Sequence, residues 1–187
     1  MKNFQKVLTN IIQETSNIFW VLFKVILPVI IVIRALELLG VIPYLAKFLD
    51  PLTSFIGIDG SLGLVWMAAI LVNIYAGMAA FASLQPIFDY SVAETTILGL
   101  IILIAHSLPI EVAIAQKSRV SGIFNLLFRF INAVIAGKIL NYIFIKFDLF
   151  NEKNQSILEI PEKITSNLDW LILQSENFFI IFLIIFL

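Results

Sequence analysis

The sequence has no cysteine and only one histidine among its 187 residues. Without cysteine the chain forms no disulfide, thiolate nucleophile or cysteine-ligated metal centre. A single histidine adds little, because typical zinc and transition-metal sites draw on several nitrogen or sulfur ligands. P-loop, GxGxxG and HExxH motifs are also absent. We therefore expect no metal, no cofactor and no enzymatic activity.

Charge is scarce as well. Charged residues make up 13% of the chain and the net charge is -1, against about 25% charged residues in globular proteins. Lys and Arg do not cluster, so we expect no nucleic-acid partner. The chain is instead 60% hydrophobic with a mean hydropathy of +1.01, and several apolar runs lack a polar face. These features predict an integral membrane protein whose surroundings are the lipid bilayer.

The first long apolar segment covers residues 17–39 and is long enough to cross a bilayer. It carries Arg34 and Glu37, which are three positions apart and therefore share a helix face. We predict that they form a structural charged pair, because pairing lowers the cost of placing either charge in a membrane.

Residues 41–57 have apolar side chains at helical spacing and polar ones opposite, which predicts amphipathic structure. Asp50-Pro51 is typical of a helix start and Gly57 of a helix end. This pattern favours two short helices in a hairpin. A single amphipathic helix lying on the membrane surface is the alternative.

Two further apolar segments are interrupted near their centres. Residues 62–84 contain Asn73-Ile-Tyr-Ala-Gly77, and the run that follows the capping-box pattern Ser91–Glu94 stops at His106-Ser-Leu-Pro109. The second run is too short to span the bilayer without the residues beyond its break. A full-length segment then covers residues 123–146. Interrupted membrane helices expose backbone groups, which persist only inside protein or beside a water-filled cavity, as in transporter solute sites.

At the first break we select Asn73, Tyr75 and Gly77 as solute-binding candidates. The Asn73 amide both donates and accepts, Tyr75 adds an aromatic face, and Gly77 permits close backbone approach. Alternatively, Asn73 bonds a neighbouring helix and Gly77 belongs to a small-residue packing face.

At the second break the candidates are His106, Ser107 and Glu111. Ser107 fits the cap position of a second half-helix, whose free N–H groups would suit an anionic or carbonyl-bearing ligand. Glu111 either neutralises that helix end or faces a cavity as a cation or proton site. His106 is either a hydrogen-bonded structural residue or a functional one.

The chain divides into an amphipathic segment 1–16, a membrane domain 17–147, a polar linker 148–169 and the start of a further membrane helix 170–187. Residues 173–179 echo residues 12–19, which suggests an internal repeat. The alternative is that polar residues before any membrane helix look alike. Either reading leads us to expect a homo-oligomer or a second half.

The stretch Ala35-Leu-Glu-Leu-Leu-Gly-Val-Ile-Pro-Tyr-Leu-Ala-Lys-Phe-Leu-Asp-Pro-Leu-Thr-Ser-Phe-Ile-Gly57, followed by Asn73-Ile-Tyr-Ala-Gly-Met-Ala-Ala80, resembles the Gate or nucleoside-recognition domain. Ferrous iron transport protein B, concentrative nucleoside transporters and spore maturation proteins A and B share this domain. The resemblance covers roughly residues 27–142 and implies broken membrane helices, two related copies and movement of a small solute. The GTPase and the pore cysteine of the iron transporter have no counterpart here, which argues against ferrous iron.

Together these features predict a polytopic all-α bundle with broken helices and a short amphipathic hairpin, placed in the bacterial inner membrane. The expected function is a transporter or permease domain for a small polar solute or ion. The alternative is a non-transporting membrane scaffold resembling the spore maturation proteins.

Overall fold

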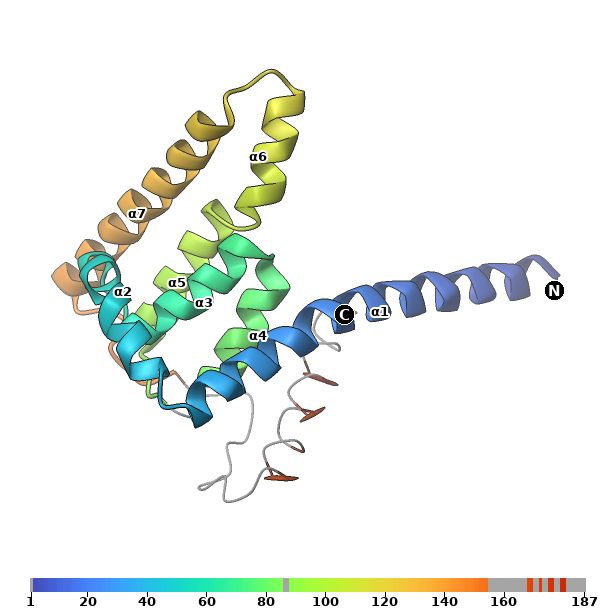
Figure 1. The fold of residues 1–187 in the computed structure, drawn as a ribbon, viewed down its shortest axis with the longest axis horizontal. Coiled ribbons are helices and arrows are strands. Elements are labelled where there is room, and N and C mark those ends of the chain that lie inside the picture. The colour runs from blue at the N-terminus through green and yellow to red at the C-terminus, as the bar shows by residue number, and fades with distance from the viewer. Residues whose placement is uncertain are drawn as a thin grey trace.

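A computed structural model describes residues 2–85 and 88–154, together with the short pieces 168–169, 172, 175–176 and 179–180. The predicted echo of the N-terminus and most of segments 148–169 and 170–187 lie outside the described residues. Residues 2–85 and 88–147 are mainly helical (Figure 1), which confirms the all-α prediction. The helices are α1 (Lys2–Leu38), α2 (Ile42–Ile56), α3 (Gly60–Leu71), α4 (Ile74–Leu84), α5 (Val92–Ile104), α6 (Leu108–Lys117) and α7 (Gly122–Phe147).

Helix α1 is continuous from Lys2 to Leu38, so no break separates the predicted segment 1–16 from the first apolar segment. Its second half packs on α4, where Ile26 and Ile30 are buried with Ala79 and Ala82. Its first half projects away from the other helices (Figure 1). The Arg34–Glu37 pair forms as predicted, with 2.8 Å between Nη1 and Oε2.

The predicted hairpin over residues 41–57 is wrong, because α2 is one helix from Ile42 to Ile56 that follows α1 at an angle of 105°. Pro51 lies inside α2, where it removes the hydrogen bond to the Lys47 carbonyl. Both residues are exposed, so neither is packed in the protein core. Gly57 ends α2 in the left-handed conformation, with φ 86°, as the sequence predicts.

Residues 62–84 do not form one spanning helix. Helices α3 and α4 instead turn back on each other at Val72–Asn73 and pack side by side. Gly77 faces Ala69, and each residue lies four positions from Asn73, which is the pattern of an antiparallel hairpin. A helix that folds back at its midpoint buries its small residues against itself, and this long-range contact is not visible in local sequence.

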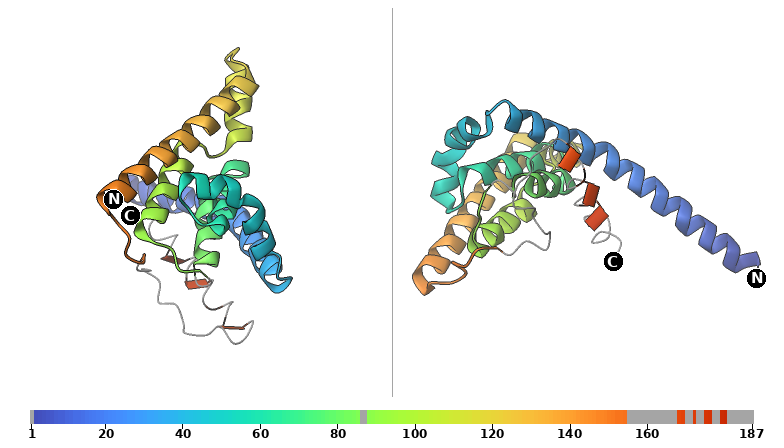
Figure 2. Two further views of the ribbon diagram at one scale, coloured as in Figure 1. Left: turned by 90° about the vertical axis from the view of Figure 1, so that its left-hand side faces the viewer. Right: turned by 90° about the horizontal axis from the view of Figure 1, so that it is seen from below.

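Helices α5 and α6 together form an interrupted apolar segment of 26 residues, Val92–Lys117, and α7 is a second apolar segment of 26 residues. At about 1.5 Å per residue, α7 spans about 39 Å, enough to cross a bilayer, whereas the 13 residues of α5 alone span only about 20 Å. The prediction that a crossing needs the residues beyond the break agrees with these lengths, because α5 and α6 together make a segment that is long and apolar enough. Helix α7 runs back along α5 and α6 (Figures 1 and 2).

The start of α3 lies beside the start of α5, so these two helices run in the same direction. The Asp59 N–H donates to Glu94 Oε1 at 3.0 Å, and the Ser61 and Tyr90 hydroxyls are 2.7 Å apart. Asp59 caps α3, while Ser91 and Glu94 form the predicted capping box of α5. We call these residues the cap cluster: Asp59, Ser61, Tyr90, Ser91 and Glu94. It anchors the end of the bundle opposite the helix breaks.

Candidate functional site

The two helix breaks meet in the folded protein. The Ser107 N–H, in the α5–α6 break, donates to the Ala69 carbonyl near the end of α3 at 2.9 Å. Beside it, the Trp66 indole N–H donates to the Ala105 carbonyl at 3.3 Å. Since α3 and α5 run in the same direction, their carbonyl ends converge here, and helix ends of this kind carry partial negative charge.

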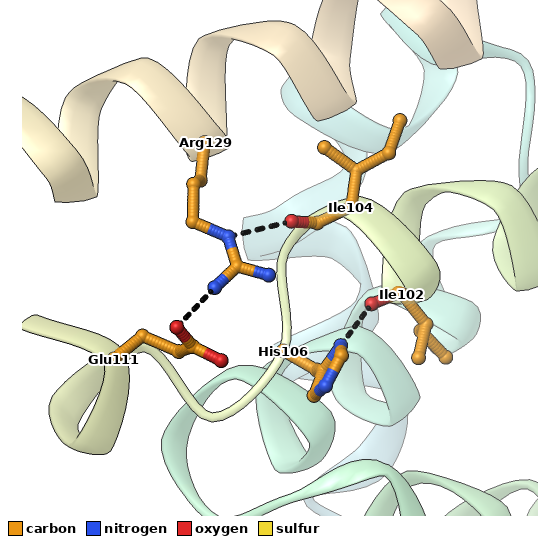
Figure 3. A network of polar contacts seen from close by, with 5 residues as sticks. All are labelled: Ile102, Ile104, His106, Glu111 and Arg129. Atoms are coloured by element: carbon orange, nitrogen blue, oxygen red, sulfur yellow. Dashed lines mark hydrogen bonds and ion pairs between the residues drawn. The ribbon is translucent and has the colours of Figure 1, made fainter. Parts of the chain in front are cut away.

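Arg129 of α7 spans the α5–α6 break. Its Nε donates to the Ile104 carbonyl at 2.9 Å, before the break, and its Nη1 lies 2.9 Å from Glu111 Oε2, after the break. Figure 3 shows this side chain reaching from α7 to both sides of the connecting loop. The Arg129 and Glu111 side chains keep 21% and 39% of their surface exposed, so the pair stays reachable from outside the core.

His106 does not join this pair. Its Nδ1 donates to the Ile102 carbonyl at 2.9 Å within the last turn of α5, and Figure 3 shows the ring turned toward that carbonyl. This geometry agrees with the structural alternative for His106, since a local bond of this kind satisfies a free helix-end carbonyl. Within the described part of the chain, no three His, Asp or Glu side chains are grouped so as to hold a metal ion.

The start of α6 offers few free donors. Ser107 occupies the cap position with φ 50° and its side chain makes no capping bond. Its carbonyl accepts from the N–H groups of Ile110 at 3.0 Å and Glu111 at 3.1 Å, and Pro109 has no N–H. The set of free N–H groups expected at this helix start is therefore largely missing, and with it the geometric basis for an anionic ligand.

The break is instead rich in acceptors. The carbonyls of Ile102, Ile104, Ala105 and Ala69 all face it, and each accepts from a group of the protein itself. The Glu111 carboxylate adds a full negative charge. Carbonyl and carboxylate oxygens accept hydrogen bonds and attract positive charge, so the break is suited to hydrogen-bond donors and cations.

The candidates of the first break serve the α3–α4 turn. Asn73 caps α4, with its Oδ1 accepting from the Ala76 N–H at 3.0 Å, so its amide oxygen is already used. Gly77 is buried against α3, where an added Cβ would lie 2.8 Å from the Ala69 Cβ. Tyr75 packs with the residues that join α4 to α1. The structure thus joins the two breaks through the Ala69 carbonyl and the Ser107 N–H. It does not bring Tyr75 and Glu111 together, because Tyr75 packs toward α1 and Glu111 contacts α7.

Arg129 and Trp66 are the residues of this site that sequence reasoning missed. Arg129 shares a helix stripe with Asn125 and Ala133, which predicts a protein-facing side, and Ala133 is indeed fully buried. The stripe carries the signal that Arg129 points inward, but no local pattern identifies its partners, because Ile104 and Glu111 lie on other helices.

An apolar cavity of about 410 Å³ lies next to the break, between α2, α3, α6 and α7. Trp66 and Phe130 form part of its wall and stack with 5.2 Å between ring centroids. Leu108 and Pro109, at the start of α6, line it from the other side. The cavity is lined mainly by apolar side chains. The polar groups that contact Arg129, the Ile104 carbonyl and the Glu111 carboxylate, do not belong to its lining.

Comparison with known proteins finds a relative that matches part of the chain. Over 98 residues the chain is 32% identical to the uncharacterized membrane protein YvoD of Bacillus subtilis (strain 168). The match covers 52% of this chain but only 30% of that relative. No family model matches the chain, and no solved structure matches it. The two apolar segments that are long enough to span a bilayer and this homologue together support a membrane protein.

Proposed function

We propose that this chain is the membrane part of a Gate-type transporter or permease, in which a small polar solute or ion passes at the α5–α6 break. The observation that carries the proposal is an interruption in the middle of an apolar 26-residue segment, lined by carbonyls and the Glu111 carboxylate. Polar backbone at membrane depth is costly, and in membrane proteins it marks solute and ion pathways.

The proposal extends to setting and partners. We place the protein in the bacterial inner membrane as a multi-pass, non-enzymatic protein that works as a homo-oligomer or with a second Gate-type half. The first half of α1 supports a partner, because it projects away from the other helices (Figure 1), and Trp20, at the middle of α1, is 54% exposed. Apolar surface of this kind faces either lipid or another subunit.

Uptake into proteoliposomes tests the function, using a panel of nucleosides and small organic cations. We expect Glu111→Gln to abolish uptake, because it removes the one acidic side chain that the structure places at the break. Asn73→Ala is expected to do the same by loosening the turn that holds Ala69 against Ser107. Glu152→Gln is the matched control, since Glu152 is exposed and lies beyond α7. Unaltered uptake in both test variants would reject this site.

One observation favours the alternative function, a membrane scaffold. The carbonyls around the break already accept hydrogen bonds from Arg129, Trp66 and Ser107, as expected if the break serves only packing. Single cysteines at positions 73, 75 and 107 discriminate, because the chain has no cysteine of its own. Labelling by a water-soluble thiol reagent supports a solute cavity, whereas complete protection supports the scaffold.

A further inference from the structure

The Arg129 side chain resembles a bound ligand more than a packing residue. It enters the break from a third helix and makes one neutral and one charged contact, to the Ile104 carbonyl and to Glu111. These two partners lie on opposite sides of the interruption, so the guanidinium is the group that joins α5 to α6 (Figure 3).

The oxygen atoms around the break are contacted by N–H groups of the protein. Four carbonyl oxygens are met by a guanidinium, an imidazole, an indole and a backbone N–H. All of these are N–H donors, and the one that carries a full positive charge sits against the carboxylate. The ends of α3 and α5 add their negative dipole ends at the same point.

We propose that the α5–α6 break binds a small cation bearing N–H groups, of the ammonium or guanidinium type, and that Arg129 occupies this site as a tethered competitor. The inference rests on the proposed function and names its solute class. A cation of this type satisfies the Ile104 carbonyl and the Glu111 carboxylate as Arg129 does, and it releases α7 from the break when it takes that place.

A cysteine at position 107 reports on the site, because Ser107 lies within the break and the chain is otherwise cysteine-free. In the Ser107→Cys background, Arg129→Ala is expected to raise the rate of thiol labelling about ten-fold, as the charged contact and the bridge are both lost. Millimolar guanidinium or methylammonium chloride should then return the rate toward that of the protein with Arg129. Sodium chloride at the same concentration should leave it raised.

A second substitution tests the acidic partner. Adding Glu111→Gln to the Arg129→Ala protein should raise the concentration of either cation needed for protection about ten-fold, because a charge-assisted bond becomes a neutral one. If Arg129→Ala does not accumulate in the membrane, Arg129→Gln replaces it, since the shorter amide keeps a donor and loses the charge.

A reporter at the other end of α3 controls for general loosening. Ser61 is fully buried in the cap cluster, and a cysteine there should stay unlabelled in the Arg129→Ala protein. Parallel labelling at positions 61 and 107 would overturn the proposal, because it would mean that the whole fold opens.

Three other outcomes also overturn it. Protection by guanidinium but not by methylammonium would show that the removed arginine side chain leaves a space that fits only its own head group. Equal protection by sodium would show that the site does not require N–H groups. Protection that does not depend on Glu111 would place the cation elsewhere. These thiol-labelling measurements do not require transport, so the cation site and the permease function can fail separately. A protein that shows the expected protection but transports no solute would refute the permease function and leave the cation site standing. Glu111-dependent uptake without protection by either cation would refute only the proposed class of cation.

Discussion

Two glycines in neighbouring parts of the bundle have opposite surroundings. Gly77 lies on α4 against α3, where an added Cβ would be 2.8 Å from the Ala69 Cβ and 3.4 Å from the Val65 carbonyl oxygen. Gly99 lies on the exposed side of α5, with no atom within 4 Å of an added Cβ. Sequence alone gives both residues the same conformational freedom, and only their neighbours distinguish them.

Gly77→Ala should therefore destabilise the protein by about 1–3 kcal/mol, because the new methyl group forces α3 and α4 apart. Gly99→Ala is the matched control and should stabilise it by about 0.5–1 kcal/mol, since alanine favours a helix interior. Thermal unfolding of the purified proteins in detergent measures both. Equal shifts would contradict the close α3–α4 contact.

Tyr90 is the residue of the cap cluster with a perturbed ionisation. Burial raises the pKa of its hydroxyl, the charges of Asp59 and Glu94 raise it further, and the hydrogen bond with Ser61 lowers it. The folded state therefore favours the neutral phenol. A pKa raised on folding contributes stability that is fully present below the unfolded value of about 10 and is lost as the pH rises above it.

We expect Tyr90→Phe to remove part of the loss of thermal stability above about pH 10, where an ordinary tyrosine begins to ionise. At neutral pH the same variant should be less stable by about 1 kcal/mol, because the Ser61 hydroxyl loses a partner. Unfolding midpoints between neutral and alkaline pH provide the measurement. Tyr142→Phe, at an exposed position, should show neither effect, and identical pH profiles for both variants would refute the assignment.

At the scale of elements, local signals located the helix ends well. Ser91 with Glu94 and Gly57 act as the sequence predicts, because caps depend on residues within one turn. The Asp50-Pro51 signal failed. A proline reads as a helix start in sequence, but α2 gains more from the burial of Ile42, Thr53 and Ile56 along one continuous face than it loses through one exposed carbonyl.

Asn73 gives a prediction at this scale, since it determines where α4 begins. Asn73→Ala should cost about 1 kcal/mol of stability through loss of the bond to the Ala76 N–H, whereas Asn73→Asp keeps an acceptor and should stay close to the original protein. Circular dichroism melting curves compare the two. If Asn73→Asp folds normally but loses uptake, the amide has a role in solute binding beyond capping. A stable Asn73→Ala protein would exclude the capping role.

Taken as a whole, the molecule offers the α5–α6 segment and α7 as candidates for crossing the membrane. They are the two described segments that are long and apolar enough to span, and α1 with α2 adds a bent third candidate. The turn between α6 and α7 and the residues after α7 are therefore expected on opposite sides of the membrane. Residues 150–154 return to the start of α5, where the Phe150 and Glu152 carbonyls accept from the Ala93 and Val92 N–H groups at 2.9 Å.

Cysteines introduced at Arg119 and Asn151, both exposed, test this arrangement. In intact cells an impermeant thiol reagent should label one of the two and leave the other unlabelled. Permeabilised cells supply the control, in which both should react. Labelling of both positions in intact cells would show that α5–α6 and α7 do not cross the bilayer as a pair.

The membrane setting, the helical class, the positions of both breaks and the Arg34–Glu37 pair can all be read from the amino-acid sequence. These follow from composition, from residues within a turn of each other, and from the absence of a polar face. Three further features became visible only in the folded protein: α3 and α4 pack side by side, the Ala69 carbonyl accepts from the Ser107 N–H, and Arg129 contacts both sides of the second break. The reason is physical: backbone groups freed by a break must find partners, and here those partners come from helices distant in sequence.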